Sequence, residues 1–178
     1  MPRRRPFLIL LVLLAGCTGV PEGVQPVTGF EVERYLGTWY EIARLDHSFE
    51  RGLSRVSAEY SRRDDAGVRV VNRGYDAANG RWNQVEGKAY FVEGPDIGRL
   101  KVSFFGPFYG GYNIFALDRQ DYSYAMISGP DKSYLWILAR RPEVDPDTLT
   151  RLVEQARELG FPVNELIQVS HAEPSAAP

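Results

Sequence analysis

Apolar and polar residues alternate in short runs through most of the chain, and clusters rich in glycine, aspartate, asparagine and proline separate these runs. In one run Val56, Ala58 and Tyr60 alternate with polar neighbours. Because side chains two residues apart in a strand share a face, the pattern predicts strands with one face in a core. The eight runs are residues 38–45, 54–62, 68–75, 82–91, 99–104, 111–118, 122–128 and 135–140. They predict an all-β fold, either an antiparallel barrel or a sandwich with a solid core.

A single helix is predicted after the last run. Asp145 is a good N-cap, Pro146 suits the first helical position, and Gly160 suits the end. The apolar residues at helical spacing are Leu149, Leu152, Val153, Ala156 and Leu159. This stripe should pack on the outside of the β-structure, and residues 161–169 can add a short strand.

The N-terminal residues 1–16 have the pattern of a secretory signal peptide: Arg3, Arg4 and Arg5 precede an apolar run at 7–14, followed by small residues. The run is too short for a permanent membrane span, which needs about 20 apolar residues. Residues 17–28 hold Gly19, Pro21, Gly23 and Pro26 without an apolar period, and they are expected to form a tether. Residues 172–178 are expected to form a loose tail.

The sequence Leu14-Ala15-Gly16-Cys17 resembles the lipobox of bacterial lipoproteins. The resemblance implies that the signal is cut before Cys17 and that this residue is acylated, which would anchor the protein in a membrane. Thr18, in place of an aspartate, favours the outer membrane by the sorting pattern of that family. An ordinary signal peptide with a chance cysteine is the alternative.

Composition narrows the function classes. At 178 residues the chain suits one domain, and a net charge of −2 with 25% charged residues gives no basic surface for nucleic acid. Cys17 is the only cysteine, so no disulfide can form within the chain. Ten tyrosines and nine phenylalanines suit strands and an aromatic-lined cavity.

No catalytic site is predicted. The only histidines are His47, in an expected loop, and His171, in the C-terminal region, so neither forms a recognisable pair with a nucleophile. A metal or haem site at His47 with Asp46 or Glu50 is less common than a solvated loop, and no phosphate-binding glycine loop precedes a helix. We therefore expect a protein that is not an enzyme and that has no metal or cofactor.

Three separated motifs resemble the signatures of lipocalins: Gly37-Thr38-Trp39-Tyr40, Asp121-Tyr122 and Arg140. The similarity to bacterial lipocalins continues through residues 41–44, 106–112 and 134–138 and covers roughly residues 30–169. It implies a lipocalin domain at 29–171, an eight-stranded antiparallel up-and-down barrel with the C-terminal helix packed outside. In this topology Trp39, Asp121 and Arg140 lie at one closed end, where Arg140 can stack on Trp39.

The opposite end is then the mouth, built from residues 46–52, 76–80, 106–110 and 129–133. If Arg140 points inward, alternation places Leu138 and Trp136 inward, and the same phase in the first strand places Glu41 and Ala43 inside. The residues expected to line the cup are Trp136, Tyr109, Tyr112, Ile114, Val56, Ala58, Tyr60, Tyr75, Tyr90, Phe104, Leu138 and Glu41. Plain core packing is the alternative at each position.

These observations predict an outer-membrane lipoprotein, with its barrel on the periplasmic side, that binds a fatty acid, a lysophospholipid or a similar amphiphile for storage or transport in envelope maintenance. The alternative is a structural or partner-binding envelope lipoprotein with a filled barrel. Self-association as a homodimer is implied only by the resemblance to bacterial lipocalins, because no residue identifies an interface.

Overall fold

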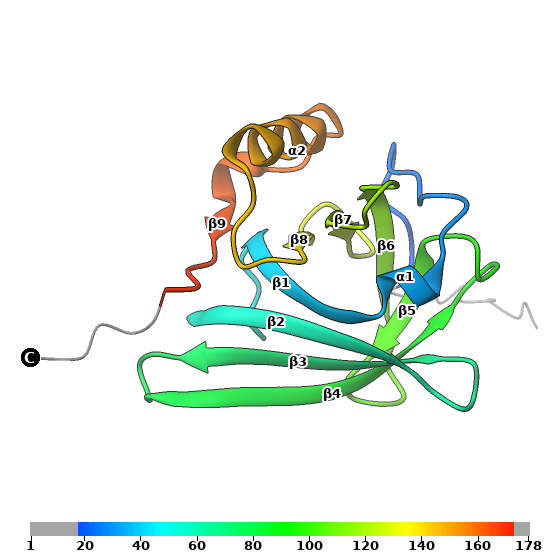
Figure 1. The fold of residues 1–178 in the computed structure, drawn as a ribbon, viewed down its shortest axis with the longest axis horizontal. Helices are drawn as coiled ribbons and strands as arrows, with labels where there is room; N and C mark the ends of the chain where they lie inside the picture. Colours follow the sequence, from blue (N-terminus) through cyan, green and yellow to red (C-terminus); the bar gives the residue numbers. More distant parts are fainter. Residues whose placement is uncertain (1–17, 173–178) are drawn as a thin grey trace, which may run out of the picture.

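The computed structural model describes residues 18–172 and shows a closed antiparallel β-barrel (Figure 1). From β1 to β8 each strand pairs with the one that follows it along the chain, and β1 also pairs with β8, which closes the barrel. The strands are β1 (Gly37–Arg44), β2 (Leu53–Arg62), β3 (Val68–Asp76), β4 (Arg81–Phe91), β5 (Arg99–Ser103), β6 (Gly110–Leu117), β7 (Tyr124–Ser128) and β8 (Leu135–Ala139). The up-and-down barrel expected from the sequence is confirmed, and the sandwich is excluded.

The helix α2 (Pro146–Glu158) packs on the outside of this barrel (Figure 1). The Asp145 carboxylate accepts hydrogen bonds from the backbone N–H groups of Asp147 and Thr148, as an N-cap does. Leu152 and Ala156 are fully buried and belong to a second apolar cluster between helix and barrel wall. After α2, the chain forms a short 3-10 helix, η1 (Val163–Glu165), and a two-residue strand, β9 (Ile167–Gln168), that pairs with β1.

The segment before the barrel differs from the free tether that the sequence suggests. Val24 and Val27 are buried against the barrel, and the N–H of Val27 donates to the carbonyl of Ile114 at 2.8 Å. A one-turn helix that the apolar pattern did not predict, α1 (Val32–Tyr35), follows and buries Val32 and Tyr35. The apolar side chains of this segment therefore cover part of the barrel instead of standing off it. The proposed signal peptide and Cys17 lie outside the described residues, as does 173–178.

A β-bulge in β1 changes which side chains face inward. The register between β1 and β8 shifts between Glu41 and Ala43, so that Ile42 and Ala43 both pack in the cluster beneath α2. The expectation that Ala43 lies inside the barrel is wrong, because strict alternation does not survive an extra residue in one strand. Arg44, which alternation would place outside, is instead buried beside Glu41.

Within residues 18–172 no helix is long and apolar enough to cross a membrane.

Candidate ligand-binding site

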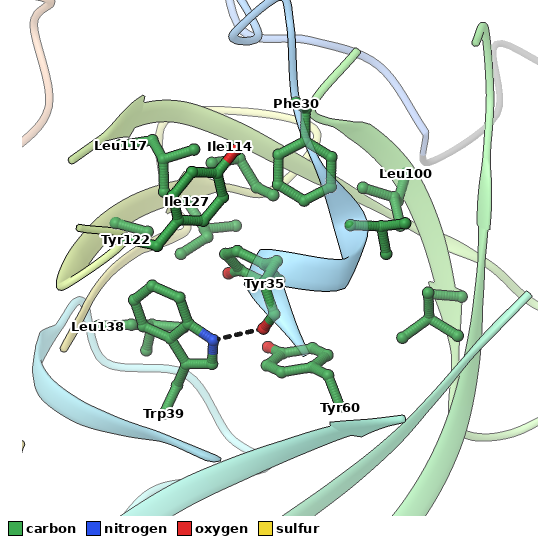
Figure 2. Close-up of a cluster of buried hydrophobic side chains, with 14 of the residues drawn as sticks. Phe30, Tyr35, Trp39, Tyr60, Leu100, Ile114, Leu117, Tyr122, Ile127 and Leu138 are labelled. Atoms are coloured by element: carbon green, nitrogen blue, oxygen red, sulfur yellow. Dashed lines mark hydrogen bonds between the residues drawn. The ribbon is translucent and has the colours of Figure 1, made fainter. Parts of the chain in front are cut away.

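The closed end of the barrel is built on Trp39 and Arg140. Trp39 is completely buried, and its indole N–H donates to the carbonyl of Tyr35 at 2.8 Å (Figure 2). The guanidinium carbon of Arg140 lies 4.1 Å from the centre of the Trp39 ring, a cation–π contact. The same guanidinium donates to the carbonyls of Arg34, Thr38 and Tyr122. It thus ties three separate segments across the base.

The turn between β6 and β7 completes the base, but the polar residue that organises it is not Asp121. Asp118 accepts hydrogen bonds from the backbone N–H groups of Gln120 and Ser123 and from the Ser123 hydroxyl. Asp121 is exposed, whereas its neighbour Tyr122 is buried at the base. Asp121 and Tyr122 were both expected at the closed end. In the structure Asp118 accepts the hydrogen bonds of the turn, and only Tyr122 packs into the base.

Three tyrosine hydroxyls meet above this base. The Tyr112 hydroxyl lies 2.7 Å from that of Tyr35 and 2.8 Å from that of Tyr60. Burial raises the pKa of each of these three tyrosines above its ordinary value, so all three remain protonated at neutral pH. Figure 2 shows Tyr35 between Trp39, Phe30 and Tyr60. Because the hydroxyls satisfy one another, this part of the interior presents mainly ring carbons.

Above these tyrosines the barrel encloses a cavity of about 850 Å³ that opens between the loops at the other end. Ten of the residues expected to line the cup do line it: Trp136, Tyr109, Tyr112, Ile114, Val56, Ala58, Tyr60, Phe104, Leu138 and Glu41. The residues that the sequence reasoning missed include Val68, Val70, Ala89, Leu100 and Val102. Parts of all four expected mouth segments also line the cavity, including Glu50, Asp76, Phe108 and Pro130. Contact of these residues with a ligand stays a prediction.

Tyr75 and Tyr90 do not line the cavity, so their expected inward orientation is wrong. Tyr75 packs outside, with its ring centre 5.6 Å from that of Trp82, and the Tyr90 hydroxyl donates to Asp65 at 2.7 Å. Their small neighbours Gly74 and Ala89 face the cavity instead. The sequence analysis took the larger apolar residue as the one that faces the interior. In these two strands the large aromatic residue faces outward and its small neighbour faces inward, so the prediction was reversed.

A buried polar cluster lies in the wall near the mouth. Nη1 of Arg44 donates to Oε1 of Glu41 at 2.7 Å, and Nη2 donates to the carbonyl of Glu50 at 2.9 Å. The Glu50 carboxylate lies 3.1 Å from Nε2 of His47 and accepts a hydrogen bond from the indole N–H of Trp136 at 3.2 Å. Glu41, Glu50 and Trp136 reach the cavity surface. Strict alternation in β1 predicts that Arg44 faces outward. The bulge between Glu41 and Ala43 turns it inward, so the sequence pattern could not indicate its place in this cluster.

The two carboxyl groups of this cluster have opposite pKa shifts. Burial raises the pKa of Glu41 well above its usual range, and the negative charge of Glu50 adds to this despite the nearby Arg44. Burial also acts on Glu50, but the His47 imidazole, the Trp136 N–H and the charge of Arg44 outweigh it and hold the pKa of Glu50 below its ordinary value. The cluster therefore favours a neutral Glu41 and an ionised Glu50 beside the Arg44 cation.

These groups do not amount to a metal centre: in the part of the chain that the structure describes, no three histidine, cysteine, aspartate or glutamate residues are placed to hold a metal ion.

A closed barrel with one plugged end and one open, mostly apolar cup belongs to the class of small-ligand-binding β-barrels. The family model described as "Lipocalin-like domain" matches residues 30–171. The chain belongs to the lipocalin family. The family consists of binding proteins, and this chain is a binding protein rather than an enzyme.

The chain is similar to named lipocalins across nearly its whole length. It is 59% identical to the outer membrane lipoprotein Blc of Vibrio cholerae over 167 residues, covering 93% of this chain and 98% of that protein. It is 52% identical to the outer membrane lipoprotein Blc of Escherichia coli strain K12 over 159 residues, covering 89% of each. These relatives support the outer-membrane, lipid-anchored localisation that the N-terminal sequence predicts.

Solved structures agree on the fold. Insecticyanin from the tobacco hornworm Manduca sexta superposes with a TM-score of 0.66 at 22% sequence identity, covering 88% of each chain. At this identity the likeness shows the shared barrel and carries no information on the ligand.

Proposed function

We propose that this lipocalin binds one single-chain amphiphile, a fatty acid or a lysophospholipid, with the acyl chain in the cup and the head group at the mouth. The acylated Cys17 holds the barrel at the outer membrane on its periplasmic side, where it stores or carries lipid in envelope maintenance. The observation that carries the proposal is the distribution of polarity along the cavity. Val70 and Leu100, towards the closed end, give an apolar deep wall, and charged lining residues such as Glu50, Arg51 and Asp131 lie in the connections at the opening.

The deep part of the cavity suits an acyl chain. Val70, Leu100 and Ile114 line it, and the nearby tyrosine hydroxyls are already satisfied by one another. A volume of about 850 Å³ falls in the range of about 300–1,000 Å³ that is typical of small-ligand pockets. A cavity of this size also disfavours the alternative of a filled barrel.

The mouth offers a cation for the head group. Arg51 lines the cavity, and its side chain is 65% exposed in an ion pair with Asp46. Such exposed pairs contribute little free energy, so the guanidinium can exchange its partner for a lipid phosphate or carboxylate at low cost. Trp136 also lines the cavity, and its indole N–H donates to the carboxylate of Glu50, the residue next to Arg51.

Native mass spectrometry of the chain from Thr18 onward, mixed with a panel of fatty acids and lysophospholipids, tests the proposal. We expect one-to-one binding that Trp136→Ala strongly weakens, while the matched control Trp82→Ala, which removes an indole outside the cavity, leaves it unchanged. Arg51→Gln should weaken binding more than Arg63→Gln, which alters an exposed ion pair at the closed end. If the folded protein binds no lipid of the panel, the carrier proposal fails and a partner-binding lipoprotein becomes the better account.

A further inference from the structure

Three phenylalanines stand exposed around the mouth. Phe49, in the β1–β2 connection, is 59% exposed, and Phe105 and Phe108, in the β5–β6 connection, are 73% and 79% exposed. All three border the opening of the cavity. We call them the aromatic rim. Large apolar side chains gathered at one end of a molecule mark a surface that meets an apolar partner.

The start of the described chain lies at the same end. The side-chain amide of Asn113 donates to the carbonyls of Gly19 and Gly129, each at 3.0 Å. A Cβ built on Gly111 would come within 2.9 Å of the Gly19 carbonyl oxygen, and one built on Gly19 would lie 3.4 Å from the Pro130 carbonyl. Gly111, Gly129 and Pro130 all border the cavity near its mouth.

This position fixes where an anchor would leave the barrel. Cys17 precedes Gly19 by two residues, and two residues of extended chain span at most about 7 Å. An acyl anchor on Cys17 would therefore be attached within about 7 Å of Gly19, close to the mouth. Phe105 and Phe108 belong to the connection that ends at Gly110, next to the contact with Gly19.

We propose that the mouth of the barrel rests on the phospholipid bilayer to which the chain is anchored, with the aromatic rim inserted into the interface between head groups and acyl chains. Amphipathic and apolar groups bind stably at that depth when a second membrane signal accompanies them, and here the lipid anchor is that signal. The ammonium of Lys101, 5.1 Å from the centre of the Tyr109 ring, lies where lipid phosphates would surround the rim.

This orientation gives the cup direct access to membrane lipid. An acyl chain could pass between the bilayer and the apolar wall of the cavity without crossing water. The inference rests on the anchor of the proposed function, but it does not depend on which lipid the cup holds.

Site-directed labelling of the full-length acylated protein tests the orientation. Because Cys17 is the only cysteine and its thiol is acylated in the anchored protein, an introduced cysteine is the only free thiol. An environment-sensitive fluorophore is attached at Phe108→Cys, or at Phe105→Cys in a separate variant. The matched control is Val92→Cys, because Val92 is 38% exposed in the β4–β5 connection at the closed end. Each protein is placed in vesicles of phosphatidylethanolamine and phosphatidylglycerol.

We expect aqueous iodide to quench the labels at 105 and 108 about fivefold less than the label at 92, and brominated lipids to quench only the rim labels. Replacing Phe49 and Phe108 by serine should raise iodide quenching at 105 towards the value at 92. Equal iodide access at the rim and at 92, or no response to the serine substitutions, would overturn the proposal.

Two further measurements distinguish contact with the bilayer from self-association and from loss of the anchor. The rim labels must stay protected from iodide when each vesicle carries on average less than one chain. If this protection disappears on dilution, the rim is in contact with another copy of the chain and the proposal is overturned. Intact-protein mass measures acylation directly, so an unacylated chain would remove the anchor and overturn this orientation. Native mass spectrometry of lipid in the cup is independent of both outcomes.

Discussion

The protonation of Glu41 gives the sharpest test of the buried cluster. Glu41 and Arg44 form a pair at 2.7 Å with side chains only 4% and 2% exposed. A pair this close would usually be ionised on both sides. Here burial and the neighbouring Glu50 raise the pKa of Glu41, and the prediction is that Glu41 is neutral while Glu50 and Arg44 carry opposite charges. The variant Glu41→Gln copies the neutral carboxylic acid and keeps an oxygen that accepts from Arg44.

The two protonation states predict different stabilities for this variant. If Glu41 is neutral, Glu41→Gln should change the free energy of unfolding at pH 7 by less than about 1 kcal/mol, since one neutral acceptor replaces another. If Glu41 is ionised, the substitution leaves Arg44 without its buried counter-ion, at a cost of about 3–5 kcal/mol. For a chain of this size that cost lowers Tm by roughly 6–20 °C, at about 2–4 °C per kcal/mol.

The pH dependence follows from the direction of each shift. A raised pKa of Glu41 means that the folded protein holds this proton more tightly than the unfolded chain. Its stabilising contribution is complete below the unfolded pKa and is lost as pH rises towards the folded pKa. The lowered pKa of Glu50 acts oppositely: its contribution is present above the unfolded pKa and is lost as pH falls through the folded pKa.

The stability of Glu41→Gln relative to the wild type should therefore increase as pH rises from 4 to 8. The loss of stability at acid pH that protonation of Glu50 causes should remain in both proteins. Thermal unfolding followed by circular dichroism across this range measures the difference. Glu59→Gln, on an exposed position of β2, is the matched control and should leave the profile unchanged. A drop in Tm of about 6 °C or more at pH 7 for Glu41→Gln would refute the neutral carboxylic acid.

Three further predictions concern the helix, the base and the cavity wall. Asp145→Ala removes the α2 N-cap and should lower the free energy of unfolding by about 1 kcal/mol in urea denaturation, whereas Leu152→Ala, at a fully buried site, should cost about 2–5 kcal/mol; equal costs would contradict the packing of α2. Arg140→Lys keeps the charge but loses the planar guanidinium that joins three carbonyls, and urea unfolding should show a loss of about 1–3 kcal/mol; an unchanged midpoint would contradict its role at the base. Tyr112→Ala should weaken lipid binding about tenfold or more in native mass spectrometry, and Tyr75→Ala should leave it unchanged; equal losses would contradict the position of Tyr75 outside the cavity.

Much of the barrel could be predicted from local patterns. Runs of alternating residues separated by turn residues indicated the strands. The up-and-down connectivity implied by the resemblance to lipocalins then placed Trp39 and Arg140, which are far apart in the sequence, at one end, where they are in contact. The boundaries of α2 also followed from local chemistry, since Asp145 and Pro146 favour a helix start and Gly160, at φ of +80°, favours its end.

It was harder to predict which side chains of each strand face the interior of the barrel. The bulge between Glu41 and Ala43 arises from the pairing of β1 with β8, and no local pattern in β1 marks it. At Tyr75 and Tyr90 the larger apolar residue faces outward, where Trp82 and Asp65 give each ring a partner. Trp82 lies in β4 and Asp65 in the β2–β3 connection, so the sequence of the strand that carries each tyrosine could not show its partner.

The all-β class and the N-terminal targeting pattern could be predicted before any coordinates, because they depend on residue periodicity, turn chemistry and a short local motif. The closed end also needed the resemblance of three separated motifs to the signatures of lipocalins. Three features became visible only in the folded chain: Arg44 turns inward, His47 and Glu50 join Glu41 in one buried cluster, and Gly19 lies beside the mouth. Each of these depends on strand register or on packing between distant segments. Those interactions set the electrostatics of the cup and hold the start of the described chain beside its mouth.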